Sequence, residues 1–64
     1  MKKFASQFKP VSLLRYEDGN GNAIVRPANG RKVFHAYYQG ELVERSGKAI
    51  EYRTMEGAAK YLIG

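Results

Sequence analysis

The sequence predicts an α+β fold, in which a small antiparallel β-sheet, a meander of about three to five strands, carries one short C-terminal α-helix packed on one face. Two observations predict it. Short runs of β-branched and aromatic residues alternate with clusters of Gly and Asn over residues 11–53, and after residue 53 the apolar residues recur with the period of a helix. The length of 64 residues fits one domain, which we place at residues 11–64 behind a basic segment at residues 1–10.

The segment at residues 1–10 combines three lysines with Phe4 and Phe8. Two interpretations stay open. The segment is either a mobile basic arm, which its polar, terminal character favours, or a short lead-in that the two phenylalanines pin to the core.

A strand-like run follows at residues 11–17, and its apolar residues are Val11, Leu13 and Tyr16. The sequence Asp-Gly-Asn-Gly-Asn at residues 18–22 then predicts a turn, because Gly and Asn adopt positive φ at little cost.

Two more strands are expected on either side of a second turn. The first covers residues 23–26 and stops at Pro27, and Asn29-Gly30 is the favoured pair for a type I′ turn. The strand at residues 32–39 is the clearest, because it is rich in β-branched and aromatic residues between two turn signals.

The hairpin partner of that strand is expected at residues 41–45, after a turn at residues 40–41. Ser-Gly-Lys at residues 46–48 interrupts this partner, and residues 49–53 resume it with alternating apolar and charged residues.

A short helix ends the chain. Thr54 is a suitable N-cap, Glu56 lies in the first turn, where the helix dipole favours an anion, and Gly64 suits the C-cap. An isolated helix of this length is marginal in water, so it must dock on the sheet. Its apolar stripe consists of Met55, Ala58, Ala59 and Leu62.

Nothing in the sequence predicts catalysis, a metal site or a cofactor. The chain has no cysteine and a single histidine, His35, so it lacks a recognisable metal-ligand set and a partnered nucleophile. Gly19-Asn20-Gly21 is followed by neither a helix nor a lysine-hydroxyl pair, so we interpret it as a hairpin turn and not as a phosphate loop. We expect a binding protein and not an enzyme.

No apolar run approaches the ~20 residues that span a bilayer, and we expect a cytoplasmic chain without a membrane partner.

The charge favours a polyanionic partner. The chain has 11 Lys and Arg against 6 Asp and Glu, a net charge of +5 and a pI near 9.8. The predicted helix carries only one basic residue, Lys60. Six others fall on predicted strands or at hairpin ends: Arg26, Arg31, Lys32, Arg45, Lys48 and Arg53. They must therefore populate the sheet face that the helix leaves open, and its rim. The residues that we expect to contact nucleic acid are Arg26, Arg31, Lys32, His35, Tyr37, Arg45, Lys48 and Arg53.

The two faces of the strand at residues 32–39 are assigned by side-chain size. The small Ala36 would let the helix approach closely, so we assign Phe34, Ala36 and Tyr38 to the helix side, although the sequence also allows the reverse. The open face then mixes arginine with aromatic residues, a combination that contacts phosphates and bases. Its expected members are Val33, His35, Tyr37, Arg45 and Arg53.

Residues 24–63 resemble a known kind of small DNA-binding domain. Val-Phe-His-Ala-Tyr at residues 33–37 is followed by a hairpin, by an aromatic-x-Thr step at residues 52–54, and by a helix with Glu56, Ala58-Ala59 and Leu62. This order is similar to that of the three-stranded-sheet-plus-helix domains that bind arm-site DNA at the N-terminus of phage-type tyrosine recombinases, and of the plant ethylene-response-factor domain. The resemblance implies that the open sheet face enters the major groove. It places Arg26, Arg45 and Arg53 nearest the DNA and Lys32 and Lys48 on phosphates.

Three functions follow as hypotheses. The leading one is a duplex-DNA-binding module of phage or mobile-element type, accessory or regulatory, to which the lysines of residues 1–10 add a basic arm. The first alternative is a protein-interaction or inhibitor module that acts on a host protein through exposed Tyr and Arg residues. The second is a binder of single-stranded RNA or DNA that stacks bases on Phe34, His35 and Tyr37.

Overall fold

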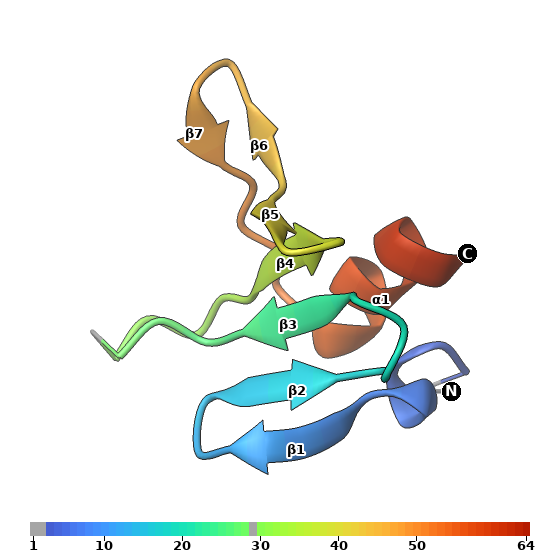
Figure 1. The fold of residues 1–64 in the computed structure, drawn as a ribbon. Coiled ribbons are helices and arrows are strands. Elements are labelled where there is room, and N and C mark those ends of the chain that lie inside the picture. The colour runs from blue at the N-terminus through green and yellow to red at the C-terminus, as the bar shows by residue number, and fades with distance from the viewer. Residues whose placement is uncertain (1–2, 29) are drawn as a thin grey trace.

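A five-stranded antiparallel sheet forms the body of the protein, and one C-terminal helix covers one of its faces, which confirms the predicted α+β class (Figure 1). The structure is a computed structural model and describes residues 3–28 and 30–64. The sheet is a meander with the order β1-β2-β3-β4-β5, and a separate two-stranded hairpin pairs β6 with β7. The elements are a 3-10 helix (Ala5–Gln7), β1 (Lys9–Ser12), β2 (Arg15–Glu17), β3 (Ala23–Val25), β4 (His35–Tyr38), β5 (Glu41–Leu42), β6 (Glu44–Arg45), β7 (Lys48–Ala49) and α1 (Met55–Ile63).

The first hairpin corrects the expected strand at residues 11–17. The chain reverses at Leu13 and Leu14, so that Ser12 of β1 lies opposite Arg15 of β2. The tip of this turn leaves the Leu13 side chain 91% exposed, and a register shift between Pro10 and Ser12 leaves Val11 55% exposed. Neither residue belongs to the core. The pattern predicted one strand because the turn at Leu13 and Leu14 contains no Gly, Asn or Pro to mark it, while Pro10, which lacks an amide hydrogen, is tolerated on the edge strand β1.

The turn at residues 18–22 forms as predicted, and the side chain of Asp18 organises it. One carboxylate oxygen accepts hydrogen bonds from the backbone amides of Asn20 (2.7 Å) and Asn22 (3.3 Å), and the other accepts one from the side-chain amide of Asn22 (2.9 Å). Gly19 and Gly21 have φ of 82° and 94°, which explains the glycines. Desolvation raises the pKa of Asp18, but these hydrogen bonds together outweigh it and hold the pKa below 3.8.

The strand expected at residues 32–39 is shorter than predicted. Its ladder with β3 runs only from Ala23 opposite Tyr37 to Val25 opposite His35. Residues 32–34 of the expected strand contribute a single bridge, between Phe34 and Tyr52. Gly30 has φ of 84°, as a turn requires, whereas Asn29, the other half of the predicted turn, lies outside the described residues.

The β6–β7 hairpin is inserted into the strand that borders β4. Leu42 pairs with Tyr37 near one end of β4, and Tyr52 pairs with Phe34 beyond its other end. Between them the chain leaves the sheet and returns, and the amide of Ile50 donates to the carbonyl of Val43 at the base of the excursion (3.1 Å). The single return strand expected at residues 41–45 and its resumption at residues 49–53 are therefore corrected to β5, a projecting hairpin and one bridge (Figure 1).

The turns from β4 to β5 and from β6 to β7 each consist of a residue with positive φ followed by a glycine with positive φ. Gln39 and Gly40 connect β4 to β5 with φ of 52° and 86°, so the turn lies one residue earlier than predicted. Ser46 and Gly47 connect β6 to β7 with φ of 55° and 78°. Two consecutive positive φ values are those of a type I′ turn, whose twist matches the flanking strands.

The helix α1 begins and ends where the sequence predicts. The Thr54 hydroxyl accepts a hydrogen bond from the Gly57 amide (3.0 Å), and the Gly64 amide donates to the Lys60 carbonyl (2.8 Å). The core forms between α1 and the sheet, where Ala36 is fully buried, so the helix side of β4 is assigned correctly for this residue. The buried residues of the core are Ala5, Phe8, Ile24, Ala36, Val43, Ala58, Ala59 and Leu62.

Residues 4–8 pack against this core as a lead-in. Ala5 and Phe8 are buried, and a carboxylate from the far end of the chain holds the segment in place. Glu56 of α1 accepts hydrogen bonds from the amides of Phe4 (3.0 Å) and Ala5 (2.8 Å). Of the three lysines of the predicted arm, Lys9 belongs to β1 and Lys3 is exposed. Lys2 lies outside the described residues. No helix in the described parts of the chain is long and apolar enough to cross a membrane.

Candidate nucleic-acid interface

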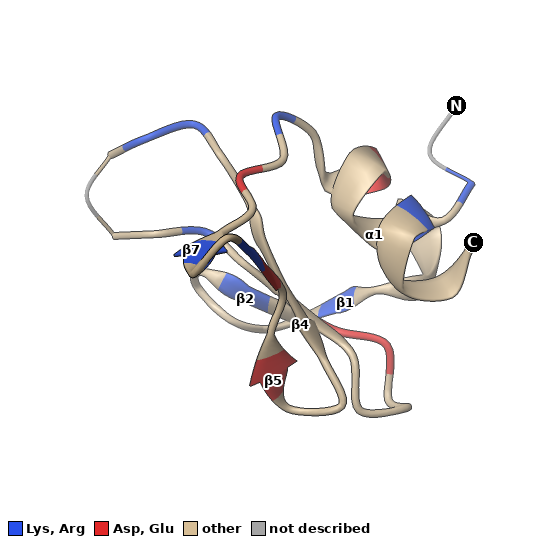
Figure 2. Cartoon of the chain, turned by 90° about the horizontal axis from the view of Figure 1, so that it is seen from above, with Lys and Arg blue, Asp and Glu red and all other residues tan. Residues whose placement is uncertain are grey.

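The strand register separates the charges along the sheet. Residues directly opposite in antiparallel strands share a position along the sheet, so the turns at residues 18–22 and 39–40 lie at one end, and the turn at residues 13–14 and the connection from β3 to β4 lie at the other. Glu17, Asp18 and Glu41 are at the first end, which we call the acidic end, although Lys9 also lies there, opposite Glu17. The second end, which we call the basic end, carries Arg15, Arg26, Arg31 and Lys32, although Glu51 also lies there, paired with Arg31 (Figure 2).

The sheet face opposite α1 carries the two predicted aromatic residues. Tyr16, Ile24 and Ala36 form one cross-strand row that packs into the core, so the neighbouring rows, which include His35 and Tyr37, point to the opposite face. His35 and Tyr37 are only half-exposed. Tyr38 was also assigned to the helix side, but it lies near the end of β4 and is 54% exposed.

Arg15 also points to this open face, near the basic end, although it was absent from the predicted interface. Its guanidinium lies 5.8 Å from the centre of the Tyr37 ring and forms a 2.7 Å ion pair with Glu17. The ion pair neutralises the charge of Arg15 locally, so the open face is less basic than its composition suggested.

Two arginines at the basic end hold the connection from β3 to β4 in place. The Arg26 guanidinium lies 5.6 Å from the centre of the Phe34 ring. Arg31 forms a bidentate ion pair with Glu51, with nitrogen–oxygen distances of 2.6 and 2.8 Å. Arg31 thus has a structural partner. Lys32 is exposed and has no ion-pair partner among the residues that the structure describes.

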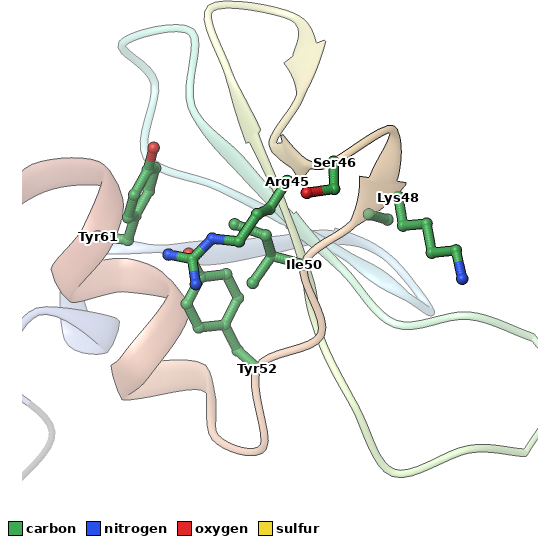
Figure 3. A pocket seen from close by; sticks show the side chains of 7 residues that line it. Arg45, Ser46, Lys48, Ile50, Tyr52 and Tyr61 are labelled. Carbon is green, nitrogen blue, oxygen red and sulfur yellow. The ribbon is translucent and has the colours of Figure 1, made fainter.

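A second basic surface lies between the β6–β7 hairpin and α1. It is a pocket of about 510 Å³, and none of its lining residues is acidic. Arg45 extends from the hairpin toward the rings of Tyr52 and Tyr61, whereas Lys48 extends outward from the rim (Figure 3). The lining residues are Arg45, Ser46, Lys48, Ala49, Ile50, Tyr52 and Tyr61; we call this site the hairpin pocket.

The position of Arg45 corrects the predicted interface. We expected Arg45 on the open face beside His35 and Tyr37, but its side chain points to α1. The inserted hairpin is the cause, because residues after Leu42 no longer follow the alternation of the sheet. Arg53, also expected on the open face, is exposed but belongs to no strand and lies immediately before the Thr54 N-cap.

Aromatic and cationic groups meet in the hairpin pocket. The rings of Tyr52 and Tyr61 have centroids 6.1 Å apart and planes tilted by 44°. Burial raises the pKa of Tyr52, the neighbouring Tyr61 raises it further, and the nearby Arg45 only partly opposes them. The Tyr52 hydroxyl therefore stays protonated at neutral pH and remains a hydrogen-bond donor. Such a site offers an apolar ring surface, a cation and neutral donors within one small volume.

Sequence reasoning missed both tyrosines of the hairpin pocket. Tyr52 was placed in the resumed strand and in the aromatic-x-Thr step of the resemblance, and Tyr61 was assigned no role. One signal was present for Tyr61: it falls outside the apolar stripe of the helix, and an aromatic residue on the polar side of a helix remains exposed.

Neither a metal-ligand set nor a similarity to a known protein indicates a function for this geometry. Among the described residues, no group of three or more His, Cys, Asp and Glu side chains is placed to hold a metal ion. No family model, no curated protein and no solved structure matches the chain.

Proposed function

We propose that this protein is a non-enzymatic nucleic-acid-binding module that attaches to duplex DNA through the basic end of its sheet and the adjoining hairpin. The observation that carries the proposal is the separation of charge along the sheet, which leaves one end basic in a chain of net charge +5. A duplex presents a dense row of phosphates, and a surface with cations gathered at one end is attracted to it in one orientation.

The dimensions of the molecule set how much DNA it can cover. It measures 27 × 22 × 22 Å, which corresponds to about seven base pairs at 3.4 Å per step. Four exposed cations without an ion-pair partner among the described residues line the basic end and the hairpin: Arg26, Lys32, Arg45 and Lys48. Four phosphate contacts imply a slope of about −3 to −4 for the logarithm of the binding constant against the logarithm of salt concentration.

The resemblance to the recombinase arm-site-binding and ethylene-response-factor domains supports the same partner. It adds that base edges are read by arginines on a sheet and that the module belongs to a phage or mobile element as an accessory or regulatory protein. A cytoplasmic location, expected from the sequence, is part of the proposal. Arg26 is the arginine best placed for this, since it is exposed at the end of β3.

The test is fluorescence anisotropy of a labelled random-sequence duplex, titrated at several salt concentrations. We expect a steep negative salt slope for the native chain. The double variant Arg26→Gln/Lys32→Gln should bind more weakly and reduce the magnitude of the slope by about 2, because it removes two phosphate contacts. The matched control is Lys60→Gln, which removes an exposed charge from α1 and should leave the slope unchanged. Equal slopes for the native chain and the double variant would contradict the proposal.

A protein-interaction module is the second candidate, and exposed apolar groups favour it. Leu13 and Val11 present a largely exposed apolar surface on the edge strand β1 and its turn, where a partner strand or groove can pack. Absence of binding to duplex and to single strands at low salt, with binding of a protein partner that weakens in Leu13→Ser, would establish this function instead.

A further inference from the structure

We infer that the hairpin pocket receives one unpaired nucleotide next to the bound duplex, so that the preferred ligand is DNA with a single-stranded end. The inference rests on the proposed function and specifies its substrate. It assigns the base to the ring of Tyr61 and the adjoining phosphate to Arg45.

Three features of the hairpin pocket fit a nucleotide. Its volume of about 510 Å³ lies within the range of about 300–1,000 Å³ that small-ligand sites occupy. One wall is apolar and aromatic, formed by Ile50, Tyr52 and Tyr61, and the other carries Arg45 and the Ser46 hydroxyl. A nucleotide is a common ligand that carries both a flat aromatic ring and an anion, which match these two walls. The absence of acidic groups from the lining removes the main source of repulsion for a phosphate.

The geometry of the two rings defines where the base lies. Tyr52 and Tyr61 are tilted by 44° and already lie in contact range, at 6.1 Å between centroids, so they leave no parallel slot for a base between them. Tyr61 is 59% exposed, whereas Tyr52 is more buried. The base therefore stacks on the ring of Tyr61, and the protonated Tyr52 hydroxyl remains a donor at the edge of the site.

A base inside a duplex cannot reach this position. Stacking on a protein ring needs a base whose face is free, and both faces of an internal base are covered by neighbouring base pairs. Arg45 and the outward-pointing Lys48 lie on the inserted hairpin, and Tyr52 of the hairpin pocket pairs with Phe34, whose ring lies under the Arg26 guanidinium of the basic end. One strand can therefore leave a duplex bound at the basic end and enter the hairpin pocket while it keeps its phosphate contacts.

The experiment compares a blunt duplex with the same duplex carrying a four-thymidine 3′ or 5′ overhang, by anisotropy at fixed salt. The native chain should bind at least one overhang duplex more tightly than the blunt duplex, by about 5- to 150-fold for one stacked base. Tyr61→Ala should lose this preference and keep the affinity for the blunt duplex, and Tyr61→Phe should retain both. The matched control is Tyr38→Ala, which removes an equally exposed tyrosine from outside the hairpin pocket and should behave as the native chain.

A second measurement reports stacking directly. A 2-aminopurine base in the overhang should lose fluorescence on binding to the native chain and to Tyr38→Ala, but not to Tyr61→Ala. If the blunt duplex binds and neither overhang improves affinity, or if Tyr61→Ala keeps the preference and the quenching, the assignment of the hairpin pocket is wrong and the proposed function stands. If neither the blunt duplex nor the overhang duplexes bind at low salt, both fail.

Discussion

Replacing Phe8 with alanine should destabilise the whole domain, whereas replacing Leu13 with alanine should leave its stability almost unchanged. Both are large apolar residues near the N-terminus, and the sequence pattern does not rank them. The structure separates them, since Phe8 is 5% exposed and belongs to the core, whereas Leu13 lies at the tip of the first hairpin.

The expected magnitudes differ by roughly tenfold. A buried Phe→Ala change costs about 3–5 kcal/mol, because it removes the transfer free energy of the ring and leaves a cavity. A domain of 64 residues has a total stability of about 3–10 kcal/mol at about 0.05–0.15 kcal/mol per residue, so Phe8→Ala removes a third or more of it. A change at an exposed site such as Leu13 stays within about 0.5 kcal/mol.

The assay is urea unfolding of the native chain, Phe8→Ala and Leu13→Ala at pH 7, followed by far-UV circular dichroism. We expect a much lower midpoint, or no folded baseline, for Phe8→Ala and an unchanged midpoint for Leu13→Ala. A loss of less than about 1 kcal/mol in Phe8→Ala would mean that residues 1–10 form a mobile arm, and a loss of more than about 2 kcal/mol in Leu13→Ala would place that side chain in the core.

Three further predictions concern the cap, the lead-in and one turn. Thr54→Ala should cost about 1 kcal/mol and lower Tm by about 4–8 °C in a thermal melt, whereas Thr54→Ser should keep the capping hydroxyl and the native Tm. The hydrogen bond from the Ala5 amide is the main cause that holds the pKa of Glu56 below 4.5, so its contribution to stability is present above pH 4.5 and is lost as pH falls through the lowered pKa. Glu56→Gln should therefore reduce the acid dependence of Tm between pH 5 and pH 2, and an unchanged dependence would contradict the contact. Gly21→Ala should lower Tm more than Gly19→Ala, because both have positive φ but only at Gly21 would a Cβ displace a side chain, that of Gln39, whose amide donates a hydrogen bond to the Asn20 carbonyl (2.9 Å).

The elements that could be predicted are those whose signals lie within a few residues. The turn at residues 18–22 follows from its own Asp, Asn and Gly, and the helix follows from its Thr54 cap and the apolar stripe beside it. Ala36 could be assigned to the helix side because only a small residue allows close packing there. These features depend on local hydrogen bonds and side-chain size, which the sequence states directly.

The candidate site was less accessible to sequence reasoning. The interface residues expected from charge and strand position are present on the surface, but Arg31 is paired with Glu51 and Arg45 faces α1. The hairpin pocket joins Arg45 to Tyr61, which is sixteen positions further along the chain. No periodicity or motif connects such residues, because their proximity arises only when the hairpin and the helix dock on the same sheet.

The sequence by itself determined the class of this fold, its turn at residues 18–22, its helix and its excess of positive charge. Tertiary structure alone decided that Ala5 and Phe8 are buried in the core, that β6 and β7 leave the sheet, and that Arg26 and Lys32 lie at the end of the sheet opposite Asp18 and Glu41. The physical reason is the range of the interactions. Glu56 holds the amides of Phe4 and Ala5 across more than fifty residues, and strand pairing sets the register of the charges; both are contacts that form only in the folded chain.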